Sequence, residues 1–297
     1  CTRVAQALMI AHIRELLNYK DLLKQLVVRD LKLRYKNSVL GFFWSLLNPL
    51  VQVATITVVV KYVLRLDIAN YSAYLLVAYL PWVFFQMALL DSSQVLILHR
   101  DLLRKVYFPR EVLPLSAVLS NLVHFLLALA VFFAYLVFYI HLILRGSGIL
   151  LTTVWLPVLV ALQSLLVAGL ACVVSCLNVF YEDTKYVLAV LLNVLFYLTP
   201  IMYPAELIKS WIATWRLPEV YKVILYKLYL LNPMNALTDA YRKTLLPVSE
   251  LKLRGTTVEA LPPDYGTLAG AAVICVLVAI LGYAFFNSHK WIFAERV

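Results

Sequence analysis

The sequence predicts an all-α membrane protein that crosses the bilayer with six helices. Of its 297 residues, 63% are hydrophobic and only 14% are charged, which differs from the composition of an ordinary soluble domain. Six stretches lack Asp, Glu, Lys and Arg, and each is long enough to cross a hydrocarbon core of about 30 Å as a helix. They do not show the apolar and polar alternation of membrane strands. The predicted spans are residues 41–60, 68–90, 112–144, 146–181, 186–205 and 265–289.

Basic residues predict the orientation of these spans. Residues 1–40 carry eight Lys and Arg residues, and the loop between the second and third spans adds Arg100, Arg104, Lys105 and Arg110. Lys and Arg are enriched in cytoplasmic loops, and an even number of spans places both chain ends on the same side. We therefore expect a multi-pass protein of the cytoplasmic (inner) membrane with both termini in the cytoplasm.

The regions outside the spans divide the chain into a cytoplasmic segment, residues 1–40, and a transmembrane domain, residues 41–297. From Ile13 to Leu33, apolar residues recur at helical spacing between charges, which predicts an amphipathic helix at the membrane interface. A helix packed on a partner protein is the alternative. Between the fifth and sixth spans, the outer segment of about residues 206–264 is aromatic and helically spaced but interrupted by charges. Short outer re-entrant or interfacial helices fit this segment better than further spans.

Polar residues gather on single faces of several predicted spans. Transported material needs a polar or adaptable surface inside a bundle, so these faces are candidates for a conduit. The alternative is that small and polar residues serve only helix packing, which we favour for the stripe from Ser164 to Asn178. The candidate lining residues are Trp44, Asn48, Gln52, Ser120, His124, Phe132, Tyr135, Tyr139, Asn193 and Tyr197.

Three kinds of site have no sequence signal. The spans carry no set of paired acidic and basic residues of the kind that ion-coupled transporters use. No Gly-x-x-x-x-Gly-Lys-Ser/Thr loop is present to hold ATP. We predict no catalytic residue, metal or cofactor in this chain, so energy for active transport must come from another polypeptide.

The cytoplasmic loop between the second and third spans combines basic and apolar residues. Leu103, Val106, Tyr107 and Phe108 stand among Arg and Lys, a mixture that suits a helix docked in a protein groove. A surface loop without a partner is the alternative.

Four segments carry a resemblance to a known family. They are RDLKLRYKNSVLGFFWSLLNP at residues 29–49, KVYFPREVLP at 105–114, NVFYED at 178–183 and NPMNALTDAYR at 232–242. Together they resemble permeases of the ABC-2 polysaccharide exporter family, which serve O-antigen, capsule and wall teichoic acid export. Glu182 stands where we expect Arg in this family, so the role of Glu182 and Asp183 is open.

The resemblance implies a homodimer of six-span subunits joined to two copies of a separate ABC ATPase, which binds ATP and Mg. It implies a conduit for an undecaprenyl-pyrophosphate-linked polymer at the subunit interface, contact with membrane lipids, and no nucleic acid. Basic donors suit a diphosphate, and the residues implied at its entrance are Arg29, Lys32, Arg34, Tyr35 and Lys36. Those implied in ATPase coupling are Asp101, Leu103, Arg104, Lys105, Val106, Tyr107, Phe108, Arg110 and Glu111.

The long, tyrosine-bearing outer segment favours wall teichoic acid as the polymer. An O-antigen or capsular polysaccharide permease and an ABC-2 drug efflux permease are alternatives with the same fold. A membrane enzyme such as a lipid-phosphate transferase should show Asp, Glu or His clustered near one membrane face, and the sequence has no such cluster.

Overall fold

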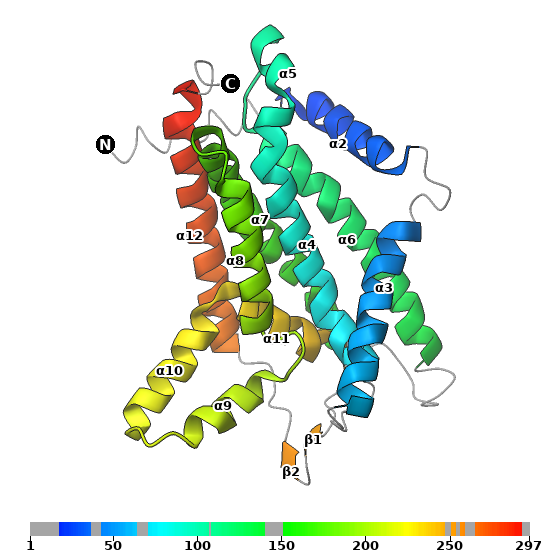
Figure 1. Ribbon diagram of the computed structural model, residues 1–297, viewed down its shortest axis with the longest axis vertical. Helices are drawn as coiled ribbons and strands as arrows, with labels where there is room; N and C mark the ends of the chain where they lie inside the picture. The colour runs from blue at the N-terminus through cyan, green and yellow to red at the C-terminus, as the bar shows by residue number, and fades with distance from the viewer. Residues whose placement is uncertain are drawn as a thin grey trace.

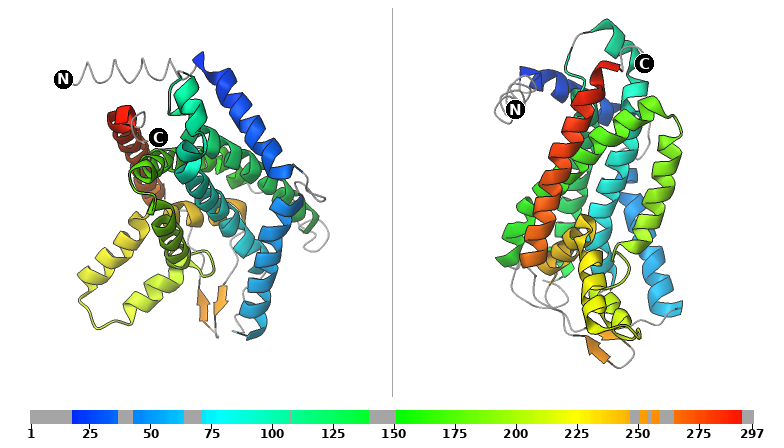
Figure 2. Two further views of the ribbon diagram at one scale, coloured as in Figure 1. Left: turned by 45° about the horizontal axis from the view of Figure 1, so that its top comes forward. Right: turned by 90° about the vertical axis from the view of Figure 1, so that its left-hand side faces the viewer.

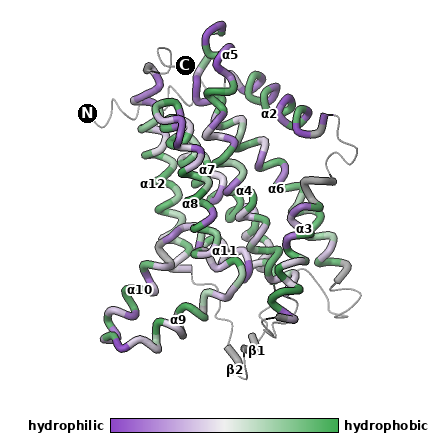
Figure 3. Tube along the Cα trace, in the orientation of Figure 1, coloured by the Kyte–Doolittle hydropathy of each residue, from purple (hydrophilic) through white to green (hydrophobic). Residues whose placement is uncertain are grey.

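The computed structural model describes residues 18–36, 43–63, 71–106, 108–139, 151–246, 251–253, 256–258 and 265–292. Four of the described helices are long and apolar enough to cross a membrane. They are α4 (Tyr71–Leu98), α6 (Val112–Tyr139), α7 (Leu156–Phe180, entered through the short helix η3, Leu151–Trp155) and α12 (Tyr265–His289). They lie side by side as a bundle (Figure 1) and are largely hydrophobic along their lengths (Figure 3).

Two shorter apolar helices coincide with the other predicted spans. Helix α3 (Phe43–Val58) continues into the π-helical turn η1 (Val59–Val63), and α8 (Thr184–Leu198) packs on α4. Helix α8 ends at Leu198, and its C-cap Thr199 has extended backbone because the following Pro200 disfavours the helical conformation there. Predicted spans therefore correspond to α3, α4, α6, α7, α8 and α12, of which four meet the length expected of a span.

Helix α4 is the centre of the bundle and packs against α3, α6, α7, α8 and α11 (Pro233–Leu245). Its buried side chains include Trp82 and Phe85, and it buries a larger share of its surface than the other long helices. At 28 residues it extends about 42 Å at 1.5 Å per residue.

Helix α4 is longer than the predicted second span, which ends at residue 90. The helix continues through Asp91 to Leu98, and the carboxylate of Asp91 is paired within the protein. Asp91 Oδ2 accepts from Arg34 at 2.6 Å and from Asn121 Nδ2 at 2.8 Å. At about 42 Å the helix is longer than a hydrocarbon core of about 30 Å, so its last turns can extend beyond the membrane.

Short elements gather at the two ends of the bundle. Helices α2 (Lys20–Tyr35) and α5 (Arg100–Lys105) lie at one end together with η4 (Lys290–Ile292), which follows α12 (Figures 1 and 2). The other end holds α11 and a projecting hairpin of α9 (Ala205–Ala213) and α10 (Glu219–Leu231). We refer to these as the α2 end and the α9 end.

Helix α2 packs on its own bundle. Leu26 is buried, and Leu22 and Leu23 pack against the same cluster, which includes Leu96 of α4 and Leu113 of α6. Val28 and Leu33 remain exposed, so α2 buries one apolar face within the bundle and leaves other apolar residues on its outer side. Its predicted beginning at Ile13 lies outside the described residues.

The outer segment is helical as predicted but also contains strands. Strand β1 (Leu251–Leu253) pairs antiparallel with β2 (Thr256–Val258), so the all-α prediction is incomplete. The β-branched residues Thr256, Thr257 and Val258 favour strands, but a pair of such short strands is easily overlooked among helical patterns.

Helices α7 and α12 meet at two glycines. A Cβ built on Gly169 would lie 2.5 Å from the Val278 carbonyl oxygen and 2.6 Å from the Ala279 Cα, and one on Gly282 would collide with the Gly169 backbone. Small residues allow such close backbone approach between membrane helices. Ala171, Ser175 and Asn178 of α7 are also buried, which confirms packing for this part of the small-residue stripe.

Candidate functional site: a polar cavity between the spans

A cavity of about 990 Å³ lies between α2, α3, α4, α6 and α8. Its wall combines amides, a histidine and a guanidinium with aromatic rings, within a protein that is otherwise mainly apolar. The lining residues are Arg34, Asn48, Pro49, Gln52, Tyr79, Leu80, Val83, Phe84, Gln86, Met87, Asn121, His124, Phe125, Ala128, Asn193, Phe196 and Tyr197.

Residues from three separately predicted stripes face this cavity. Asn48 and Gln52 come from α3, His124 from α6, and Asn193 and Tyr197 from α8. These positions are far apart in sequence, and the bundle brings them into one wall. Arg34, predicted at the entrance, reaches the same cavity from α2.

The other predicted lining residues have different positions. Ser120 is buried, and Phe132 and Tyr135 line an adjoining apolar groove between α3, α4 and α6. The side chains of Trp44 and Tyr139 lie outside the described part of the structure.

Helix α4 contributes polar lining that the sequence reasoning missed. The Tyr79 hydroxyl donates to Gln52 Oε1, and Gln52 Nε2 donates to Asn48 Oδ1 at 3.2 Å. Gln86 follows Tyr79 by seven residues, which places both on one helical face. This seven-residue spacing is the sequence signal that identifies the side of α4 that lines the cavity.

A polar cluster stands at the α2 end of the cavity. Besides its ion pair with Asp91, Arg34 donates to Asn121 Oδ1 at 3.2 Å, and Asn121 Nδ2 also donates to the Ala117 carbonyl at 2.9 Å. The cluster ties α2 to α4 and α6. Arg34 is therefore charge-paired within the protein while it faces the cavity.

Replacing Asp91 with alanine is expected to loosen α2 without unfolding the bundle. Both partners of the Arg34 ion pair are more than a third exposed, at 37% and 40%, so solvent screening limits the loss to about 1 kcal/mol or less. Hydrogen–deuterium exchange should show several-fold faster exchange in residues 22–34. Glu219→Gln, which removes the exposed ion pair with Lys222 on α10, should leave this exchange unchanged. Equal exchange in Asp91→Ala and the parent protein would contradict the assignment.

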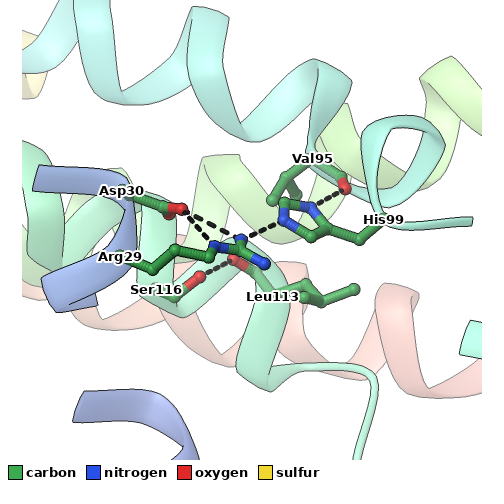
Figure 4. A network of polar contacts seen from close by, with 6 residues as sticks. All are labelled: Arg29, Asp30, Val95, His99, Leu113 and Ser116. Carbon is green, nitrogen blue, oxygen red and sulfur yellow. Dashed lines mark hydrogen bonds and ion pairs between the residues drawn. The ribbon is translucent and has the colours of Figure 1, made fainter. Parts of the chain in front are cut away.

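A second contact pins α2 to the junction of α4 and α5 (Figure 4). The Arg29 guanidinium contacts His99 Nε2 and is paired with Asp30 at 3.0 Å, while His99 Nδ1 lies 2.8 Å from the Val95 carbonyl oxygen. A ring that donates from Nδ1 and accepts at Nε2 satisfies both contacts. The contact joins the predicted entrance helix to His99, two residues before Asp101, the first of the predicted coupling residues.

The remaining basic residues of α2 face outward. Lys32 and Lys36 are exposed and line a groove of about 1020 Å³ along α2, together with Lys24 and Arg29. The side chain of Tyr35 lies outside the described part of the structure. Among the predicted diphosphate residues, Arg29 and Arg34 thus hold α2 in place, and Lys32 and Lys36 present their charges to the surroundings.

The predicted coupling loop has an exposed and a buried part. Asp101, Arg104, Lys105 and Val106 are exposed and Leu103 is half-buried, whereas the side chain of Tyr107 lies outside the described residues.

Phe108 and Glu111 of this loop are buried instead. Glu111 accepts from Lys290 Nζ at 3.0 Å, and the Arg110 guanidinium donates to the Lys290 carbonyl. Phe108, Arg110 and Glu111 anchor the loop near the end of α12, whereas residues 101 and 104–106 are exposed.

The α9 end of the cavity is held by a buried arginine. Arg242 of α11 donates to the carbonyl oxygens of Ile201 and Tyr203 at 2.5 and 3.1 Å, and its guanidinium lies 3.9 Å from the centroid of the Tyr74 ring. These carbonyls belong to the segment that follows α8. Arg242 thereby fixes the end of the helix that presents Asn193 and Tyr197 to the cavity.

A sequence profile described as ABC-2 type transporter matches residues 21–246, which is most of the chain and includes every helix that lines the cavity. This chain belongs to the ABC-2 type transporter family. The resemblance drawn from residues 29–49 and the three later segments is therefore confirmed at the level of the family.

Three relatives match this ABC-2 type transporter over nearly its whole length. It is 30% identical over 289 residues to the O-antigen export system permease protein RfbA of Myxococcus xanthus, covering 97% of this chain and 100% of that relative. Two proteins of the same name from Klebsiella pneumoniae are 30% and 29% identical, each over 93% of this chain and 94% of their own length.

In the described part of this ABC-2 type transporter, no group of three or more His, Cys, Asp and Glu side chains is placed to hold a metal ion. The cavity offers amide, hydroxyl and imidazole groups with aromatic rings. Such a wall can hydrogen-bond and stack on a polar solute as it passes.

Proposed function

We propose that this chain is the permease subunit of an ATP-driven exporter for a polysaccharide of the O-antigen type, carried on undecaprenyl pyrophosphate. The observation that carries the proposal is the polar cavity within a membrane bundle of an ABC-2 type transporter. The names of the relatives support O-antigen export, which was an alternative, better than the wall teichoic acid favoured by the outer segment.

The lining suits a sugar chain. Amide groups of Asn48, Gln52 and Asn193 can exchange hydrogen bonds with successive hydroxyls, and aromatic rings such as Phe196 and Tyr197 offer faces for sugar rings. Most of these groups are neutral, so no single sugar is held by a strong charge contact. A surface of weak, repeated contacts allows a polymer to advance.

The proposed assembly has six spans in each subunit, with α3 and α8 as the shorter ones, and both termini in the cytoplasm at the α2 end. Asn48, Gln52 and Asn193 are exposed in the single chain although they lie on membrane helices. Lipid cannot satisfy such groups, so we propose that a second copy of this chain covers them and completes the conduit. Two ATPase subunits, holding ATP and Mg, would dock on the exposed part of residues 101–106.

The substrate class can be tested with the chain reconstituted in proteoliposomes together with its ATPase. ATP-dependent translocation of a lipid-linked polysaccharide is expected, with ATPase activity stimulated by that substrate. Hydrophobic drugs should not stimulate it. Stimulation by drugs without polysaccharide transport would instead support the efflux alternative, and transport without the ATPase would contradict the proposed energy source.

Removing the exposed charges of α2 is expected to impair export and leave assembly intact. In Lys32→Gln/Lys36→Gln, the diphosphate loses two charged donors, and we expect export to fall about tenfold, the effect of roughly 1.4 kcal/mol. Export is measured as surface polysaccharide, and assembly as the size of the purified complex. Lys20→Gln removes a charge from the same helix outside the groove and should have little effect. Unchanged export in the double variant would contradict a role of Lys32 and Lys36 in binding the diphosphate.

A further inference from the structure

A second cavity, of about 600 Å³, lies beside the polar one between α3, α4 and α6. Its wall is apolar over most of its length, with Leu50, Val53 and Ala54 from α3, Leu76 from α4 and Val131 from α6. Leu50 and Val131 are 44% and 41% exposed in the single chain, so the cavity is a groove that opens sideways from the bundle. We call it the tail groove.

The polar groups of the tail groove gather at the α9 end. Lys61 and Tyr62 of η1 stand just after α3, and Ser72 lies in the first turn of α4, where its hydroxyl is 3.4 Å from that of Tyr135 near the end of α6. The groove therefore has a basic and hydroxyl-bearing end and an apolar interior. This polarity matches an amphipathic ligand with its head at the α9 end.

The tail groove shares part of its wall with the polar cavity. Pro49, Leu80 and Ala128 line both. A molecule with a hydrocarbon chain and a polar portion could thus occupy the apolar groove while its polar portion lies next to the hydrogen-bonding wall. The hydrocarbon part of a lipid-linked substrate would then lie in the tail groove, and its polar part in the neighbouring polar cavity.

We infer that the tail groove binds the hydrocarbon chain of a phosphate-bearing lipid, the carrier of the exported polymer, with its phosphate at Lys61 once the head group has left Lys32 and Lys36 at the α2 end. The identification of this lipid as the carrier rests on the proposed function. Lipid chains in the bilayer are as apolar as the groove, so apolar contact alone gives little selectivity over bulk lipid. Selection depends on the charge of Lys61 at the groove end and on the shape of the wall.

The inference is tested on the full chain in phosphatidylcholine nanodiscs, without ATPase or polymer, using a polyprenyl monophosphate with a photoactivatable group on its hydrocarbon chain. Labelling is expected on peptides of α3, α4 and α6 that line the groove. Ala54→Trp, which fills the groove without touching the polar cavity, should reduce this labelling at least fivefold. Lys61→Gln should reduce it at least threefold, and as an exposed residue it leaves packing intact.

A matched control is Val273→Trp, which places the same ring on an exposed position of α12 and should leave labelling unchanged. A polyprenol probe without phosphate should label the groove more weakly than the phosphate probe. The inference is overturned if Lys61→Gln and Ala54→Trp label like the parent chain, or if the two probes label equally. The labelling assay contains no transport step, so it tests this inference separately from the proposed function. Export without groove labelling would contradict this inference alone. Groove labelling without export would contradict only the proposed function.

Discussion

Placing a methyl group on Gly169 or Gly282 is expected to destabilise the fold more than any surface change. The Cβ of alanine at position 169 would meet backbone atoms of Val278 and Ala279 at 2.5 to 2.8 Å, and the contact at 282 is tighter still. Backbone cannot rotate away as a flexible side chain does, so α7 and α12 must separate. Overpacking typically lowers the free energy of unfolding by 1–3 kcal/mol, and we expect a loss of about 3 kcal/mol for each variant.

The measurement is thermal unfolding of the purified protein in detergent. Gly169→Ala and Gly282→Ala should lower the midpoint by several degrees, whereas Gly270→Ala on α12 should be neutral or slightly stabilising. A Cβ at Gly270 meets no atom within 4 Å, and alanine has the higher helix propensity. If all three variants unfold at the same temperature, the close approach of α7 and α12 is not present in the protein.

Replacing Arg242 with methionine is the second change expected to have a large effect. Methionine keeps the length of the side chain but leaves the carbonyls of Ile201 and Tyr203 without their charged donor. Each buried acceptor that loses a charged partner lowers the free energy of unfolding by about 1–3 kcal/mol. We therefore expect a total loss of about 3 kcal/mol. The same unfolding assay measures it, and export should also fall because the end of α8 is released.

Arg216→Met is the control, since it makes the same substitution at an exposed position between α9 and α10 and should change stability by less than about 0.5 kcal/mol. Arg242→Lys should recover only part of the loss, because an ammonium group does not reproduce the planar fork of a guanidinium. Stability equal to that of the parent protein in Arg242→Met would show that the two carbonyls are satisfied in another way.

Local sequence patterns predict much of this fold. The last span was predicted as residues 265–289, which are the bounds of α12, and the helically spaced segment of about residues 206–264 contains α10 and most of α9. Spans are predictable because the bilayer imposes a length and a composition on each helix separately. The pairing of Asp91 with Arg34 was not predictable, since it joins two different helices.

The candidate site was predicted in part for the same reason. Helical spacing identifies which residues share a face, so Asn48 with Gln52 and Asn193 with Tyr197 were found as pairs. It does not say which faces meet, so the α4 wall with Tyr79 was missed. Phe132 and Tyr135 were assigned to the conduit, but they line the tail groove. Burial of Glu111 against Lys290 joins residues 179 positions apart in the chain, which no local pattern reveals.

The most direct test of the proposed path is to place a photocrosslinking amino acid in the polar cavity during active export. Position 52 on α3 faces the cavity, and position 273 on α12 is exposed on the outside of the bundle. With the ATPase running, polysaccharide adducts are expected at position 52 and not at position 273. Continuing export with no adduct at position 52, or with equal adducts at both positions, would contradict a path through this cavity.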